Sequence, residues 1–196
     1  YANDDEVIDR IISAYQELPE RNGRQQRATK TAQEWRGIME REGRGIFPAN
    51  SVLIPRAIRK MGSVYLSRMP VFVSTNFVVY SPRTFEEAVL LSTWMSTIFY
   101  QLICEVSSKD LEGMRKMEVA DIEKTYVPKF ESLSEEMVIR LCEIYRNIEF
   151  IRLDRPIIRE VDSLWASALF GEQAAELLEK AQRLLEYLAN RRNPNS

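Results

Sequence analysis

The spacing of hydrophobic residues changes twice along the chain. It is helical before residue 46, becomes β-like after it, and is wholly helical again after Pro128. Short runs of Val, Ile, Phe and Tyr, with turn residues between them, predict strands in the middle part. The chain is therefore predicted to be an α+β protein, with a small twisted β-sheet packed on a long helix and helical segments on either side. Its three parts are expected at 1–45, 46–130 and 131–196.

The middle part is predicted to contain three strands followed by the long helix. The strands are expected at 51–54, 62–67 and 71–80, where β-branched and aromatic residues dominate. Thr84 is placed to cap a helix that continues to about Glu105. The apolar face of that helix requires a deep core.

Helices fill the two outer parts. Before residue 46 they are predicted at 4–18 and 31–42, and after residue 130 they are predicted from Ser134 onward, at 156–169 and at 172–191. The last helix carries a narrow apolar stripe from Ala174 to Leu188, which is close to a coiled-coil seam. Packing within the domain explains such a stripe; the alternative is a partner helix or helix-mediated self-association.

The absence of histidine excludes several classes of chemistry. Without it the chain has no Ser-His or Cys-His nucleophile pair and no histidine-ligated zinc site. The net charge is −2, yet between Arg21 and Arg68 eleven basic residues stand against three acidic ones. A local basic region matters more for phosphate binding than the total charge does. Charge distribution therefore leaves nucleic-acid binding open.

Cysteine content and hydropathy bear on the compartment. Cys104 and Cys142 both fall inside predicted helices, as buried reduced thiols do, which favours a cytoplasmic protein. No apolar run has the length of a membrane span, and no signal peptide opens the chain. Because the chain begins at Tyr1, we expect it to be a piece of something longer.

One segment carries the clearest functional signal. It begins at Gly113, continues with the adjacent cations Arg115 and Lys116, and ends at Val127-Pro128. Acids that alternate with Ile122 predict a short, half-exposed strand before that end. A glycine lets the backbone approach DNA closely, and the cations can neutralise phosphates or donate to base edges.

Five short pieces of the chain, two of them from this segment, follow one another in a characteristic order. They are Val52-Leu53-Ile54-Pro55-Arg56, the run 71–79, Trp94-Met95-Ser96-Thr97-Ile98-Phe99, Gly113-Met114-Arg115-Lys116 and Val127-Pro128. In order and spacing they resemble the target-recognition (specificity) domain of adenine-N6 DNA methyltransferases and restriction–modification enzymes, and are similar to Type I-like specificity subunits. The resemblance covers about residues 47–138.

The resemblance implies sequence-specific recognition of duplex DNA in a restriction–modification or phage-defence system. The implied partner is a methyltransferase catalytic domain or subunit, which would use S-adenosylmethionine, and the chain itself is expected to have neither cofactor nor catalytic residues. It lacks the glycine-rich cofactor loop and the Asn/Asp-Pro-Pro-aromatic motif of a complete methyltransferase. Asn193-Pro194 shares only part of that motif.

The residues expected to contact DNA are cations and polar side chains near turns. The set is Arg56, Arg59, Lys60, Ser74, Asn76, Lys109, Arg115 and Lys116. Arg115 is the favoured base or phosphate contact because arginine can donate two hydrogen bonds to guanine. A β-bulge or a hydrogen-bonded cross-strand step is the alternative interpretation of Ser74 to Asn76.

Two other functional classes remain open. The chain could be a protein-interaction module that docks a partner through its acidic C-terminal helices. It could also be an enzyme that uses paired carboxylates such as Glu118 and Asp121. The acids of 121–124 have the residue types of a metal nuclease at the wrong spacing, so no metal site is expected.

Overall fold

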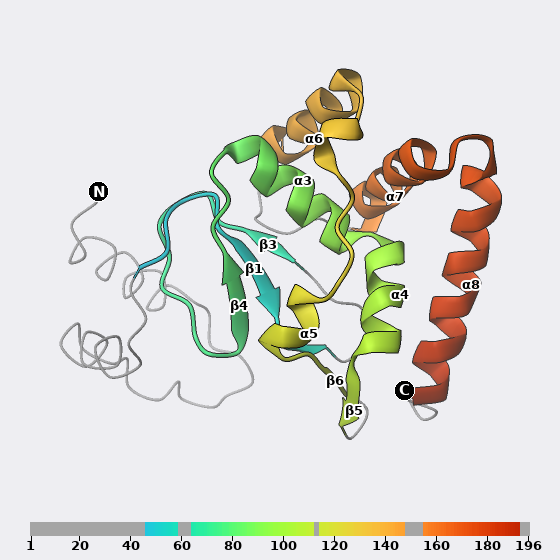
Figure 1. Ribbon diagram of the computed structural model, residues 1–196, viewed down its shortest axis with the longest axis horizontal. Helices are drawn as coiled ribbons and strands as arrows, with labels where there is room; N and C mark the ends of the chain where they lie inside the picture. Colours follow the sequence, from blue (N-terminus) through green and yellow to red (C-terminus); the bar gives the residue numbers. More distant parts are fainter. Residues whose placement is uncertain (1–45, 59–63, 112–113, 148–154, 193–196) are drawn as a thin grey trace, which may run out of the picture.

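The computed structural model describes residues 46–58, 64–111, 114–147 and 155–192 (Figure 1). These residues form two small antiparallel sheets and a set of helices, which confirms the predicted α+β class. The helices predicted at 4–18 and 31–42 lie outside the described residues.

The first sheet has the strand order β3-β1-β4. Its strands are β1 (Val52–Pro55), β3 (Tyr65–Leu66) and β4 (Phe77–Tyr80). The strand predicted at 71–80 is shorter than expected, because the amide of Phe77 donates to the carbonyl of Ser74 and closes a turn there. The sequence 74–76 is therefore a turn and not a step within a strand.

The second sheet has the order β2-β6-β5. Its strands are β2 (Ala57–Ile58), β5 (Lys109–Leu111) and β6 (Met114–Lys116). Lys116 of the central strand β6 lies opposite Ala57 on one side and opposite Lys109 on the other. The cations that were expected in a glycine-led loop thus lie on the second strand of a hairpin. Only one residue, Arg56, separates β1 from β2, so the chain bends at Arg56 and passes directly from one sheet into the other.

The long helix predicted from residue 85 is two helices, α3 (Phe85–Ser96) and α4 (Ile98–Ser107), bent by 65°. Thr97 between them is extended, and its hydroxyl accepts a hydrogen bond from the amide of Tyr100. A hydroxyl that caps a helix in this way favours a new start over continuation. The carboxylate of Asp162, on a later helix, accepts a hydrogen bond from the amide of Ile98 at 2.8 Å and holds the bend.

The remaining helices are α5 (Val119–Glu123), α6 (Glu135–Asn147), α7 (Arg155–Phe170) and α8 (Ala174–Arg192). Ser134 caps α6 as predicted, through a bond from the amide of Met137. The short strand predicted around Ile122 and ending at Val127 is wrong, because α5 occupies that position. Asp121 starts this helix by accepting a hydrogen bond from the amide of Glu118 at 3.0 Å.

One apolar core runs through the middle and C-terminal parts of the chain, across the boundary expected at residue 130. It includes Val52, Trp94, Leu141 and Trp165, all 5% exposed or less. The ring of Trp165 lies 5.4 Å from that of Trp94, centroid to centroid, and ties α7 to α3. The sheets and the C-terminal helices therefore fold around shared side chains.

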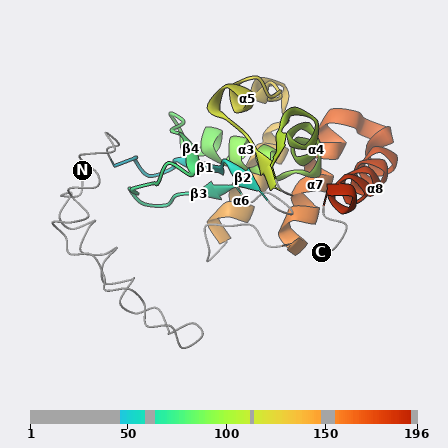
Figure 2. The same ribbon diagram turned by 90° about the horizontal axis from the view of Figure 1, so that it is seen from below.

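The apolar stripe of α8 is used inside the domain. Leu178, Ala181 and Leu185 pack against a group on α4 that comprises Ile98, Phe99 and Leu102. Figure 2 shows α4, α7 and α8 side by side, away from β4. Of the two explanations for the stripe, packing within the domain accounts for these residues.

Two further sequence observations can be compared with the structure. Cys104 and Cys142 are free and buried, as expected of reduced thiols. Among the described residues no single helix is long and apolar enough to cross a membrane, although the bent pair α3 and α4 passes that test when joined.

The buried cap at the helix bend predicts a pH-dependent stability. Burial raises the pKa of Asp162 from 3.8 to about 6, so the folded protein binds this proton more tightly than the unfolded chain does. The stabilisation linked to that proton is complete below pH 3.8 and is lost as the pH rises through 6. Asp162→Asn keeps an acceptor without the buried charge. We expect it to raise the free energy of unfolding at pH 7 by roughly 1–3 kcal/mol and to remove this pH dependence.

Denaturant unfolding of both proteins at several pH values between 4 and 7 measures this effect. Glu160→Gln is the matched control, since Glu160 lies on the same helix with a side chain that is 41% exposed. A difference between Asp162→Asn and the unsubstituted chain that stays constant over this pH range would contradict the assignment.

Candidate nucleic-acid interface

The site forms where the chain passes from one sheet into the other at Arg56. The amide of Arg56 donates to the carbonyl of Asn76 at 2.9 Å, next to β4 of the first sheet. Its carbonyl accepts from the amide of Met117 at 2.9 Å, just after β6 of the second. Asn76 and Met117, which are 41 residues apart in the sequence, are thereby held on either side of Arg56.

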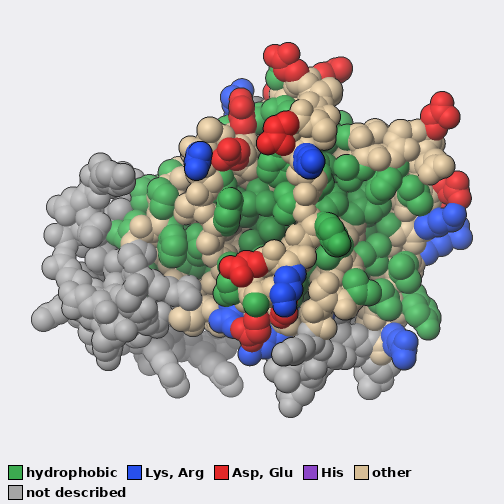
Figure 3. Space-filling model, viewed as in Figure 1, with side chains coloured by type: hydrophobic (Ala, Val, Ile, Leu, Met, Phe, Trp, Pro, Cys, Tyr) green, Lys and Arg blue, Asp and Glu red, His purple; other side chains and the backbone are tan. Residues whose placement is uncertain are grey.

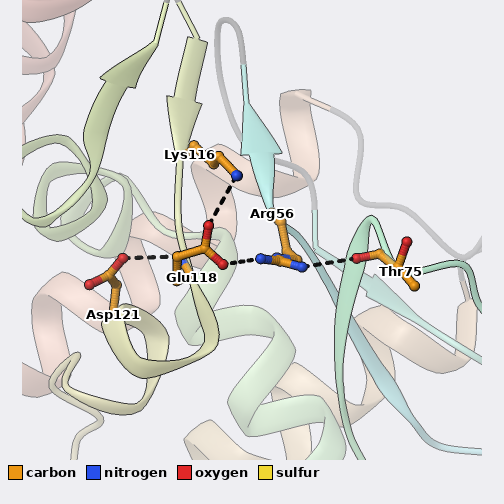
Figure 4. Close-up of polar contacts among 5 residues, drawn as sticks. All are labelled: Arg56, Thr75, Lys116, Glu118 and Asp121. Atoms are coloured by element: carbon orange, nitrogen blue, oxygen red, sulfur yellow. Dashed lines mark hydrogen bonds and ion pairs between the residues drawn. The ribbon is translucent and has the colours of Figure 1, made fainter.

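The side chains around this junction form a hydrogen-bonded group (Figure 4). The guanidinium of Arg56 contacts the carboxylate of Glu118 through Nη2 and the carbonyl of Thr75 through Nη1. Lys116 Nζ contacts the other carboxylate oxygen, Oε1 of Glu118, at 3.1 Å. We call Arg56, Lys116 and Glu118 the junction triad.

The junction triad is accessible to solvent. The side chains of Lys116 and Glu118 are 48% and 43% exposed, and that of Arg56 is 26% exposed. The hydrogen bond from Lys116 is the main cause that holds the pKa of Glu118 below its usual value, with the nearby charge of Arg56 adding to it. Glu118 is therefore a carboxylate at neutral pH.

The turn at 74–76 borders the triad. Ser74, Thr75 and Asn76 are exposed, and the hydroxyl of Ser74 accepts a hydrogen bond from the amide of Asn76 at 3.4 Å. Four residues expected from the sequence to contact DNA (Arg56, Ser74, Asn76 and Lys116) are thus brought to one place. Together they present donors and acceptors on a surface at the meeting point of the two sheets.

The two adjacent cations of β6 point in opposite directions, as successive side chains of a strand do. Lys116 is exposed, whereas Arg115 is buried and only 1% exposed. The guanidinium of Arg115 donates to the backbone carbonyl of Gln101 at 3.1 Å and to its side-chain oxygen at 3.2 Å, and lies 3.4 Å from Glu105. The expectation that Arg115 contacts a base or phosphate is therefore wrong for this structure.

Arg115 instead fastens the hairpin to α4. Burial is the main cause that raises the pKa of the neighbouring Cys104 thiol to about 11, with the charge of Arg115 acting in the opposite direction. The thiol stays protonated, as a structural cysteine does. Arg115 thus supports the strand that carries Lys116 and does not face the solvent.

The structure gives less information on the three other residues predicted to contact DNA. Lys109 lies on β5, where its backbone pairs with that of Lys116. Arg59 and Lys60 lie outside the described residues. Their part in a DNA surface stays a prediction.

Glu118 is the site residue that sequence reasoning missed. It appeared there only with Asp121, as a candidate catalytic pair. In the structure Asp121 caps α5, and Glu118 binds the two cations, so each carboxylate has a structural partner. The available signal was the spacing Lys116-x-Glu118, which places both side chains on the same face of an extended chain.

Charged side chains gather in a few places on the face seen in Figure 1. Figure 3 shows hydrophobic side chains over α3 and α4, with a mixed group of basic and acidic side chains over α5 and the nearby end of β6. Because the charges at the triad are of both signs, electrostatic attraction for phosphate is weaker there than at a purely basic surface.

The burial of Arg115 predicts a large effect on stability. Arg115→Ala removes a buried cation that contacts Gln101 and the 7% exposed side chain of Glu105, and is expected to lower the free energy of unfolding by about 3 kcal/mol or more. Lys116→Ala removes only an exposed ion pair and is expected to cost less than about 1 kcal/mol. Thermal and denaturant unfolding compare the two variants. Equal stabilities would contradict the structural role of Arg115.

The comparisons with known proteins agree with the resemblance seen in the sequence. The family model for the specificity domain of restriction endonuclease BpuSI matches residues 1–158. The solved structure of the type IIG restriction endonuclease BpuSI is 32% identical, with a TM-score of 0.68. The match covers 95% of this chain and 22% of that one, so the chain spans about a fifth of its solved relative. Among curated proteins no match was found. With a family model that covers most of its length, the chain belongs to the specificity domains of BpuSI-type restriction endonucleases.

Proposed function

We propose that this chain recognises a specific sequence in duplex DNA and that the junction triad and the adjoining turn form part of the contact surface. The observation that carries the proposal is the membership in a specificity-domain family together with the convergence of Arg56, Lys116 and the 74–76 turn. Sequence is read by groups that reach base edges, while cations position the domain on phosphates.

The arrangement of the triad favours sequence-specific recognition of DNA over non-specific electrostatic attraction to phosphate. The side chains of Lys116 and Glu118 are exposed yet held by their mutual contact and by Arg56. Preorganised side chains lose less conformational freedom on binding, which favours specific contacts. Lys109 lies on β5, and Arg59 and Lys60 follow β2 of the same sheet in sequence. We propose all three as further contacts to the DNA backbone.

The chain acts, in this proposal, as the non-catalytic specificity part of a larger restriction–modification enzyme. The match covers 22% of its solved relative, so methyl transfer and cleavage would belong to regions outside this chain. S-adenosylmethionine would bind to the associated methyltransferase region. No observation favours the alternative of an interaction module.

Selection of duplexes from a randomised pool by the purified chain tests this function. We expect an enriched sequence, and an affinity that falls steeply as salt increases, because phosphate contacts release counterions. Lys116→Ala is expected to weaken binding of the enriched duplex by about tenfold, within the range for a lost base or phosphate contact.

Lys180→Ala is the matched control for this variant. Lys180 is also an exposed lysine paired with a glutamate, but it lies on α8, with a side chain that is 66% exposed. Its removal is expected to leave DNA affinity unchanged. A pool from which no sequence is enriched at low salt would overturn the proposal.

A further inference from the structure

The junction triad contains a carboxylate where a surface built only for phosphate would not place one. Glu118 lies between the two cations, with Oε1 toward Lys116 and Oε2 toward Arg56. A negative charge in this position repels phosphate and neutralises part of the attraction of its neighbours. Its presence needs an explanation beyond general DNA affinity.

The triad has a defined order of hydrogen-bonding groups. Lys116 offers a donor, Glu118 an acceptor and Arg56 a second donor, as Figure 4 shows. An ionised carboxylate has about four acceptor positions, and among the described residues one cation contacts each oxygen. The exposed carboxylate therefore has acceptor capacity left for a ligand while the cations keep it in place.

Base pairs differ in the order of the groups that they present in the major groove. An A·T pair presents an acceptor at N7 of adenine, a donor at its N6 amino group and an acceptor at O4 of thymine. A G·C pair presents two acceptors, N7 and O6 of guanine, followed by the N4 donor of cytosine. Only the A·T order is complementary to donor, acceptor, donor.

The spacing of the triad is compatible with this match. Lys116 Nζ and Glu118 Oε1 are 3.1 Å apart. The amino and keto groups of a base pair are hydrogen-bonded to one another, at about 2.9 Å. Opposite a G·C pair the central carboxylate would face the O6 acceptor of guanine, which is unfavourable because neither group has a proton to donate.

We propose that Glu118 is a specificity-determining residue and that the junction triad reads one A·T base pair in the major groove. Glu118 accepts a hydrogen bond from the N6 amino group of adenine, and Lys116 and Arg56 donate to the acceptors on either side. The inference rests on the proposed function, since it assigns a base pair to the same surface.

The test compares sequence logos from the randomised duplex pool for the full chain and for Glu118→Ala. We expect the unsubstituted chain to select A·T at one position where Glu118→Ala accepts any base pair, with the other positions unchanged. At that position discrimination against G·C should fall by roughly 5- to 150-fold. Binding of unrelated duplexes should strengthen, because a negative charge has been removed.

Glu160→Ala is the matched control. It removes a carboxylate on α7 that is similarly exposed and paired with Arg140. Glu118→Gln keeps one acceptor oxygen and is expected to retain most of the A·T preference. Melting temperatures of all variants show whether a loss of selection reflects unfolding.

A second measurement uses the unsubstituted chain and a modified duplex. Replacing the selected adenine by purine removes the N6 amino group and should weaken binding of the unsubstituted chain by about tenfold, but not that of Glu118→Ala. A logo in which Glu118→Ala relaxes a G·C position, or relaxes none, overturns this inference and leaves the proposed function standing. A chain that selects no sequence at all overturns both.

Discussion

Two backbone hydrogen bonds at a single residue fix the two sheets of this domain relative to one another. Arg56 donates from its amide to Asn76 and accepts at its carbonyl from Met117, so the chain leaves one sheet and enters the next without a loop. A loop would place the two sheets more freely, since longer connections have more conformational freedom. Everything at the proposed surface depends on this junction, because it sets the turn at 74–76 beside the residues that follow β6.

The arrangement of the helices depends on the bend between α3 and α4. Thr97 interrupts what would otherwise be one helix, and the carboxylate of Asp162 caps the second half from α7. The 65° bend lets α4 lie along α8 while α3 packs against the first sheet and α6. Buried Arg115 then fastens β6 to α4 through Gln101 and Glu105. Strand β6, which carries Lys116, is in this way attached to α4, and the bend after α3 places α4 next to it.

Local interactions explain which elements could be predicted. Hydrophobic spacing and caps such as Thr84 and Ser134 act within a few residues, so the α+β class and the helices α6, α7 and α8 followed from the sequence. The predicted strand near Ile122 failed because a capping carboxylate, Asp121, outweighed the alternation of apolar and polar residues. The single helix from residue 85 failed because a distant side chain, that of Asp162, stabilises the break at Thr97.

The sequence by itself determined the family, the fold class and the residue types of the surface, because those depend on composition, order and local spacing. Only the tertiary structure decided which residues share that surface. Arg115 and Lys116 are adjacent cations of similar chemistry, and strand alternation together with the acceptors on α4 places one inside and the other in solvent. Glu118 joined the site because the chain crosses between sheets at Arg56, 62 residues earlier, a contact that no local pattern encodes.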